Sequence, residues 1–245
     1  MSFEHEGFFA DVHVPGRGDS LDTCAWRTFR MLGLLKDVDQ SFSQWFAQGW
    51  THEEALTRRL DMERDILTAA FETNRIAGRT WHSLGAWNGL DDSASTFHVF
   101  CGNAPPGIDT ITFDPHEAGP TGERLLQAPV MTALLRALAI AWEPQAGIVM
   151  SHRHREVAFK DAEFEHRIGW VNYFSRSLGS LPALPDPVQV EPVDDIGSLV
   201  ILTAERFVTS NPAHVALSLQ VSATLREAGV LKPLLAPSPP PGATS

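Results

Sequence analysis

The stretch that decides the fold is WHSLGAWNGLDDSASTFHVFCGNAPPGIDTITFD, which occupies residues 81–114. Three runs within it are rich in the β-branched and aromatic residues that favour strands: Trp81 to Trp87, Thr96 to Cys101 and Thr110 to Phe113. Asn88-Gly89 and residues 103–107 separate these runs, and both segments contain the residues of tight turns. Because such short turns join antiparallel neighbours, this stretch predicts an antiparallel meander.

Helical periodicity appears on both sides of the meander. Apolar residues at helical spacing predict one helix that begins at Leu21 and another from Met131 to Trp142. Thr51-His52-Glu53-Glu54 matches a capping box, in which the Thr hydroxyl and the Glu carboxylate satisfy backbone amides at a helix start. The helix that it opens is expected to bury Leu56, Leu60, Leu67 and Phe71. A last helix is predicted between Asn211 and Gly229.

Four further apolar runs predict strands at residues 11–14, 148–150, 168–174 and 199–203. The last run is nearly all apolar, which favours a central place in the sheet. Hairpin-like strand pairs dominate the middle of the chain, so the predicted fold is α+β. We expect a mainly antiparallel sheet flanked by several helices, in a single domain over residues 1–231. The Pro-rich segment 232–245 cannot bury apolar area and is predicted to be disordered.

The charge of the chain restricts its partners. The 245 residues include 19 Lys and Arg against 30 Asp and Glu, a formal net charge of -11. This balance argues against nucleic acid or an anionic membrane and favours a basic protein. The acidic N-terminus is unlike a secretory signal, and the longest apolar stretch, residues 130–142, is too short to cross a bilayer. Cys24 and Cys101 each stand alone in an apolar context, so we expect reduced core thiols in a cytoplasmic protein.

Two histidines suggest an alternative function. His152 and His154 follow a predicted strand, where alternation would place both imidazoles on one face, and Asp161 and Glu163 could complete a metal site. A metal-dependent hydrolase is therefore the alternative. The spacing matches no established metal signature, and the chain contains no phosphate-binding loop and no Gly-x-Ser-x-Gly motif. Our main prediction includes no catalytic residue, no metal and no cofactor.

Paired acids and two tryptophans are the candidate partner-binding residues. Asp91-Asp92 and Asp194-Asp195 fall in predicted turns, where solvated carboxylates could face a basic cleft and imitate phosphates. The alternative is that they only form Asx turns and keep the protein soluble. Trp87 and Trp170 lie beside turn residues or glycine and are candidate exposed anchors. The alternative for them is a place in the core.

Several short sequence motifs follow one another along the chain. They are Trp45, LGAWNG at 84–89, FHVFCG at 97–102, GWVNYF at 169–174, GSLVIL at 197–202, TAERF at 203–207 and a last helix that ends AGVL at 228–231. In this order they resemble the immunity protein 52 family of bacterial polymorphic toxin systems. The resemblance implies an α+β fold, no catalysis and an inhibitory partnership with a toxin encoded next door. It also implies that the toxin carries a restriction-endonuclease-like nuclease domain.

The leading hypothesis combines this resemblance with the charge. We expect a cytoplasmic immunity protein that binds a cognate toxin, a basic nuclease domain, and neutralises it by stoichiometric protein–protein inhibition. Neither nucleic acid nor a membrane is an expected partner. A metal-dependent hydrolase built on His152 and His154 and a structural or scaffolding subunit are the alternatives.

Overall fold

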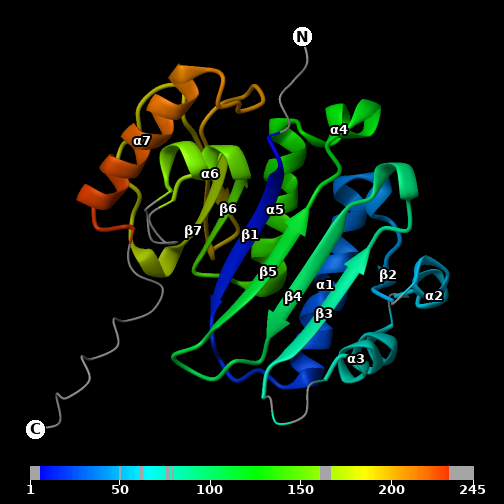
Figure 1. Ribbon diagram of the computed structural model, residues 1–245. Coiled ribbons are helices and arrows are strands. Elements are labelled where there is room, and N and C mark those ends of the chain that lie inside the picture. The colour runs from blue at the N-terminus through cyan, green and yellow to red at the C-terminus, as the bar shows by residue number, and fades with distance from the viewer. Residues whose placement is uncertain are drawn as a thin grey trace, which may run out of the picture.

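Strand β1 (Phe8–Pro15) is the middle strand of a nine-stranded antiparallel sheet (Figure 1). The structure is a computed structural model that describes residues 6–49, 51–60, 63–75, 78, 80–160 and 167–231. Within these residues the strand order is β2-β3-β4-β5-β1-β6-β7-β9-β8. β1 pairs with β5 (Ile108–Asp114) on one side and with β6 (Ala146–Ser151) on the other. This arrangement confirms the predicted α+β fold with a mainly antiparallel sheet.

The other strands extend the sheet on both sides of β5, β1 and β6, and helices pack on the sheet. The strands are β2 (Phe46–Ala47), β3 (His82–Trp87), β4 (Thr96–Cys101), β7 (Val171–Ser175), β8 (Gln189–Val193) and β9 (Gly197–Ile201). The α-helices are α1 (Leu21–Val38), α2 (His52–Thr57), α3 (Arg64–Thr73), α4 (Gly119–Leu125), α5 (Ala128–Trp142), α6 (His152–Ala158) and α7 (Pro212–Glu227). The short 3-10 helices are η1 (Gln40–Phe42), η2 (Asp91–Ser93) and η4 (Arg176–Leu178).

The helices cover the two faces of the sheet unequally. α1 and α5 pack on each other behind the sheet in the view of Figure 1, and α5 contacts β1, β6, β7, β8 and β9. α6 and α7 lie on the opposite side, near β6 and β7. In front of β3, β4 and β5, Figure 1 shows no helix. The sheet therefore has one fully covered face and one partly covered face.

The core lies between α5 and the middle of the sheet. Val12 of β1 is fully buried, and so are Leu135 and Leu138 of α5. Gly147 of β6 pairs with Val12 and leaves room for these side chains. A Cβ added to Gly147 would lie 2.6 Å from Val12 Cγ1 and 3.1 Å from Leu135 Cδ1. The packing at this point therefore depends on the missing side chain of Gly147.

The meander at residues 81–114 is confirmed, with β4 within the predicted bounds and β3 and β5 within two residues of them. The predicted helices from Leu21, up to Trp142 and from Asn211 are confirmed as α1, α5 and α7. Asn211 accepts a hydrogen bond from the N–H of Ala213, as expected of an N-cap. Gly229 has a φ of +70°, as expected at a helix end.

The helix expected after Thr51 is wrong in its extent. Thr51 caps α2, but this helix ends at Thr57 and α3 begins only at Arg64. Between them the Leu60 N–H donates to the carbonyl of Trp45 (2.8 Å), which ties the segment to β2 instead of continuing the helix. Leu56, expected to be buried, is 43% exposed. Pairing with β2 thus outweighs the helical periodicity of the segment.

Two strand predictions also need correction. β9 is fully apolar at Leu199, Val200 and Ile201, yet it is the second strand from the edge, not a central one. These three consecutive side chains point to alternate faces of the sheet and are all buried, so β9 is covered on both faces. The edge strand β8 was not predicted, because Pro192 argues against a strand unless it lies at a sheet edge. The predicted disorder of residues 232–245 lies outside the described residues.

The two cysteines are neighbours in the core. Cys24 on α1 and Cys101 on β4 are both fully buried, and their thiols interact with each other. Burial raises the pKa of the Cys101 thiol, and the contact with Cys24 raises it further. The prediction of core thiols is confirmed, and the structure adds that the two residues, far apart in sequence, are neighbours.

Within the described residues, no single helix is long and apolar enough to cross a membrane. α4 and α5 together reach the required length and composition, with a bend of 68° between them.

The packing of α5 gives the first prediction. Leu138→Ala empties a fully buried site and should lower the free energy of unfolding by about 2–5 kcal/mol. Leu219→Ala on α7, where the side chain is 45% exposed, is the matched control and should cost less than about 1 kcal/mol. Urea denaturation measures both values. Equal losses in the two variants would contradict the assignment of α5 as the core helix.

Candidate partner-binding surface

One buried side chain holds the loop that follows β3. Asn88 is fully buried, and its amide nitrogen donates to the carbonyls of Ser41 (3.2 Å) and Ser93 (3.0 Å). Its amide oxygen accepts from the backbone N–H groups of Ser95 (3.1 Å) and Leu90 (3.4 Å). The amide thereby uses both of its donors and both acceptor positions. Asn88 fixes the loop from residue 88 to residue 95 against η1.

Gly89 lets this loop turn over an aromatic ring. Its φ is +75°, and an added Cβ would lie 2.4 Å from Cε2 of Phe46. Both facts require glycine at this position. The ring of Phe46 in turn lies 6.3 Å from the ring of Trp87, measured between centroids. The Asn88-Gly89 turn predicted from the sequence is therefore confirmed, and it lies on two aromatic side chains.

The loop presents two exposed carboxylates beside apolar surface. Asp91 Oδ1 lies 2.8 Å from His52 Nε2, and the His52 ring lies 5.3 Å from the ring of Trp87. Asp92 is exposed, Leu90 is 36% exposed and Trp87 is half-buried. We call these five residues the acidic corner. An apolar anchor with a polar rim is typical of a protein-binding hot spot.

The second pair of acids lies at the other end of the sheet. Asp194 and Asp195 are exposed in the turn between β8 and β9, where Arg176 Nη1 donates to the Asp195 carbonyl (3.4 Å). These three residues border a surface hollow of about 380 Å³. Strands β3 and β9 are six strand spacings apart, so the two acidic pairs are separated by roughly 30 Å. The structure therefore brings Trp87 together with Asp91 and Asp92 but not with Asp194 and Asp195.

The tryptophans are placed differently from the prediction. Trp170 is fully buried, and its Nε1 donates to the carbonyl of Thr203 (2.9 Å), so the expectation that it is exposed is wrong. Sequence reasoning missed Trp26 on α1, which is 41% exposed and has the Arg30 guanidinium 5.7 Å from its ring centroid. Its position off the apolar stripe of α1 is the signal that could have identified it.

The side chains of β3, β4 and β5 that point away from α1 and α5 form a second surface, which we call the open face. It comprises Ser83, Thr96, His98, Phe100, Thr110, Thr112 and Asp114. The Phe100 ring lies 4.6 Å from the ring of Trp81 and 5.1 Å from that of His98. Burial lowers the pKa of His98, which keeps it neutral at neutral pH. The acidic corner lies at the edge of this face, where β3 ends.

Two titratable groups of β1 border the open face. Burial raises the pKa of Asp11 to about 7, although a hydrogen bond from Thr112 Oγ1 (3.1 Å) and the charges of Arg167 and Arg155 oppose the shift. Burial lowers the pKa of His13 to about 3, and the charge of Arg167 acts in the same direction. Near neutral pH the Asp11 carboxyl is therefore partly protonated and His13 is neutral.

The predicted arrangement of His152 and His154 is wrong. Both lie in α6, because the Ser151 hydroxyl accepts a hydrogen bond from the His154 N–H (3.0 Å) and caps a helix there. His154 is fully buried, with its Nε2 2.9 Å from Ser218 Oγ, and burial lowers its pKa to about 4. The ring of His152 instead stacks on that of Phe9 at 4.8 Å. The two imidazoles thus have separate environments.

Asp161 and Glu163, which are predicted to complete the metal site, lie outside the described residues. Among the side chains that the structure does describe, no group of three or more His, Cys, Asp and Glu could hold a metal ion.

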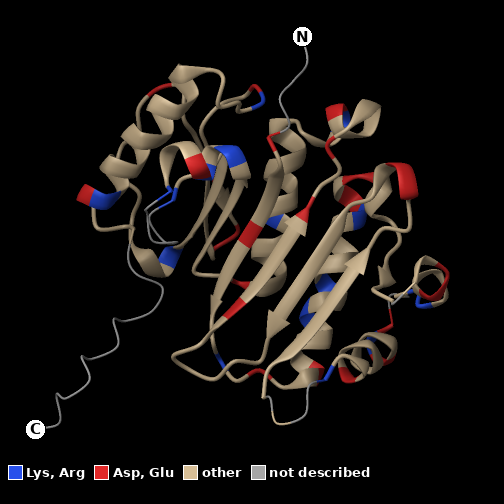
Figure 2. Ribbon diagram, in the orientation of Figure 1, with Lys and Arg blue, Asp and Glu red and all other residues tan. Residues whose placement is uncertain are grey.

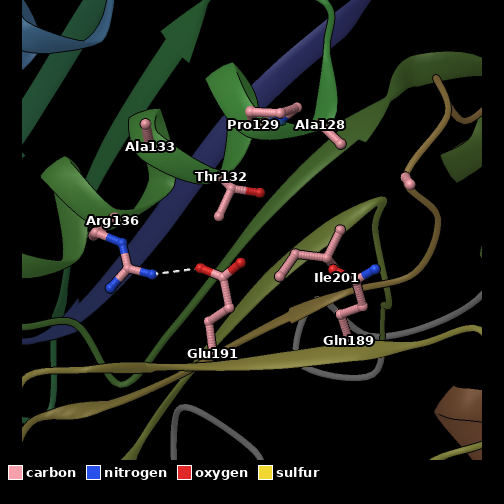
Figure 3. Close-up of a pocket in the computed structure, with 9 residues that line it drawn as sticks. Ala128, Pro129, Thr132, Ala133, Arg136, Gln189, Glu191 and Ile201 are labelled. Carbon is pink, nitrogen blue, oxygen red and sulfur yellow. Dashed lines mark hydrogen bonds and ion pairs between the residues drawn. The ribbon is translucent and has the colours of Figure 1, made fainter.

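A shallow hollow of about 330 Å³ lies between α5 and the β8–β9 edge (Figure 3). Its charged groups are Arg136 and Glu191, which form an ion pair at 2.7 Å. Arg136 also donates to the carbonyl of Pro192 (2.7 Å), so this guanidinium is committed to holding β8 against α5. The remaining lining is largely small and apolar: Ala128, Pro129, Thr132, Ala133, Ile201 and Ala204, with Gln189. The hollow thus offers a ligand little polar chemistry.

Comparison with known proteins identifies the family. The sequence profile described as immunity protein 52 matches residues 6–234, nearly the whole chain. The chain belongs to the immunity protein 52 family. Membership in an immunity-protein family implies a toxin as the binding partner. The comparison with curated proteins found no match to this chain.

A solved structure supports the fold of this immunity protein 52 family member. The Pseudomonas aeruginosa T6SS protein PA0821 aligns with a TM-score of 0.59 at 13% sequence identity. The alignment covers 96% of this chain and 77% of that chain. At this level of identity the two proteins share a fold, and the likeness carries no information on the residues that bind a partner.

The network around Asn88 gives the second prediction. Asn88→Ala removes four hydrogen bonds and leaves buried backbone groups without partners, so it should lower the free energy of unfolding by about 2 kcal/mol or more. Hydrogen exchange of the Leu90 and Ser95 amides should accelerate. The control is Asn74→Ala, which loses one exposed hydrogen bond to the carbonyl of Ala70. Unchanged exchange at both amides would refute the role of Asn88.

The third prediction concerns Asp11. The pKa of Asp11 is about 7 in the folded state, above the ordinary value of 3.8. As the pH rises between these two values, ionisation of this carboxyl therefore lowers the free energy of unfolding. Asp11→Asn imitates the protonated form, so the variant should be more stable than the parent at about pH 8, with the advantage vanishing near pH 4. His13 titrates in the opposite sense and is present in both proteins, with its Nε2 3.8 Å from Asp11 Oδ2 in the parent. A pH-independent difference in urea denaturation would contradict the shift.

Proposed function

We propose that this chain neutralises a cognate toxin by binding it stoichiometrically, and that the toxin is a nuclease domain with a basic surface. Membership in the immunity protein 52 family carries the proposal. The proposed site of action is the cytoplasm, where such a nuclease would meet nucleic acid. No step of this function requires turnover, a metal or a cofactor.

The charge of the protein supports a basic partner. A nuclease that cleaves nucleic acid presents positive surface to phosphates, and the net charge of -11 would attract that surface over a long range. At the acidic corner, Asp91 and Asp92 are already exposed, so pairing with partner cations would not first require burying them. These carboxylates would occupy the places of phosphates in the toxin.

The acids also have a purely structural explanation. Asp91 forms an ion pair with His52, which connects α2 to the loop after β3. Asp194 has a φ of +42°, a left-handed conformation that Asp adopts more readily than most residues. These roles leave Asp92 and Asp195 as the better probes of partner binding, because the contact described for Asp195 uses its backbone carbonyl and neither side chain takes part in the contacts described above.

The alternatives receive no specific support from the site. A hydrolase that uses His152 and His154 would need both rings to face one ion, whereas His154 is engaged with Ser218 and His152 with Phe9. A structural or scaffolding subunit would have no need to bind and inhibit a toxin, so membership in an immunity-protein family does not favour this alternative. Metal content after purification of the untagged protein tests the hydrolase directly.

Stoichiometry is the fourth prediction. When the purified protein is titrated against the toxin encoded by the neighbouring gene, nuclease activity should fall linearly and vanish at equivalence. Coexpression should also protect cells from this toxin. Complete inhibition at a few per cent of an equivalent would instead indicate turnover and contradict the proposal.

Charge at the acidic corner gives the fifth prediction. Asp92→Lys should slow association with the toxin several-fold at low salt, with a smaller effect at physiological ionic strength, because rim charges act mainly on the association rate. The melting temperature should not change, since Asp92 is exposed.

The matched control for this prediction is Asp195→Lys, the same substitution in the turn at the opposite end of the sheet. It should have a smaller effect if the acidic corner is the contact. If both variants associate at the parent rate at every salt concentration, neither acidic pair contributes to recognition.

A further inference from the structure

Three neighbouring strands expose one whole face without a helix to cover it. Figure 1 shows β3, β4 and β5 with α1 and α5 behind them and nothing in front, while α6 and α7 lie beside them near β6 and β7. One solvated face is common in antiparallel sheets, so exposure by itself identifies no function. The residues of the face distinguish an ordinary solvated surface from a binding surface.

The open face has no basic residue of its own. Strands β3, β4 and β5 contain neither Lys nor Arg, and Figure 2 shows acidic but no basic positions along them. Its histidine, His98, is exposed but partly desolvated by its neighbours, which lowers its pKa and leaves it neutral at neutral pH. The acid on it is the exposed Asp114, whose Oδ2 lies 3.3 Å from Thr96 Oγ1. Arg155 and Arg167 act electrostatically on Asp11 of the neighbouring strand β1, and the exposed Arg59 lies opposite Phe46 at the β2 edge. Solvated faces normally mix both signs of charge.

Aromatic side chains take the place that charged ones would have on a solvated face. Phe100 belongs to the open face, and Trp81 just before β3, Trp87 at the end of β3 and Phe46 on β2 lie beside it; all four are half-buried. Their rings form two pairs, Phe46 with Trp87 at 6.3 Å and Trp81 with Phe100 at 4.6 Å. Protein interfaces are enriched in aromatic residues and depleted of Lys at their centres. The face therefore has the composition of an interface centre, with the acidic corner as its rim.

We propose that the open face, together with the acidic corner, is the surface on which the toxin docks, and that Arg and Lys side chains of the toxin contact it. This inference rests on the proposed function and adds the surface and its chemistry. Charge complementarity favours a basic protein as the partner of this face. A second copy of this chain would bring another acidic face and another net charge of -11 against it.

His98 lies in the middle of this surface, paired with Gly85 on β3 and Thr112 on β5, and is exposed. His98→Arg therefore puts a cation at the centre without filling a cavity. It should weaken binding of the catalytically inactivated toxin, the product of the neighbouring gene, by about tenfold or more. Phe100→Ala, which removes a ring without adding charge, should also weaken binding. Gln220→Arg on the exposed side of α7 is the matched control and should bind as the parent does.

A second measurement does not depend on substitutions. Hydroxyl-radical footprinting of the parent protein should show Trp81, Trp87 and Phe100 protected in the toxin complex, with Trp26 on the opposite side still reactive. Sedimentation of the free protein accompanies it, because a dimer that His98→Arg dissociates would make the face a contact between copies and overturn the inference.

The outcomes separate this inference from the proposed function. If the parent neutralises the toxin while His98→Arg and Phe100→Ala bind it equally well, the open face is not the docking surface and the immunity function stands. If the parent itself neither binds nor inhibits the toxin, both proposals fail.

Discussion

Burial of α5 against the middle of the sheet is the interaction on which the rest of the structure depends. Leu135 and Leu138 of this helix are fully buried, and the side chains of Leu135 and Val12 of β1 both approach Gly147, which leaves space for them. A fully buried Leu side chain contributes about 1.5–3 kcal/mol from its transfer out of water alone. The contacts of α5 extend from β1 to β8, so one helix joins the centre of the sheet to its far edge.

The same packing explains why the surfaces differ. α1 packs on α5, and the two helices form a layer behind the sheet in the view of Figure 1. On the other side, α6 and α7 cover only the region of β6 and β7, so the outward residues of β3, β4 and β5 remain accessible. The resulting asymmetry places the residues that we propose to meet a partner on a sheet. Positions on a sheet are better fixed than positions on a free loop.

Asn88 extends this rigidity to the loop at the edge of the open face. Its four hydrogen bonds replace the backbone pairing that the chain loses where β3 ends, so the backbone of residues 88–95 is anchored against η1. A backbone fixed in this way has less conformational freedom to lose on binding, which favours association with a partner. This is the link between local sequence, the Asn88-Gly89 turn, and the recognition that we propose.

The sequence by itself determined the α+β class, the meander at residues 81–114 and helices α1, α5 and α7, because these depend on periodicity and capping over neighbouring residues. It also singled out Asp91, Asp92 and Trp87 as candidate partner-binding residues, and these are close in the chain and close in space. Only the tertiary structure decided that Trp170 is buried, that Cys24 and Cys101 meet and that Asp194 and Asp195 lie far from the acidic corner. Those facts depend on strand order and on which helix covers which face. Strand order is set by packing between segments distant in sequence, about which local periodicity carries no information.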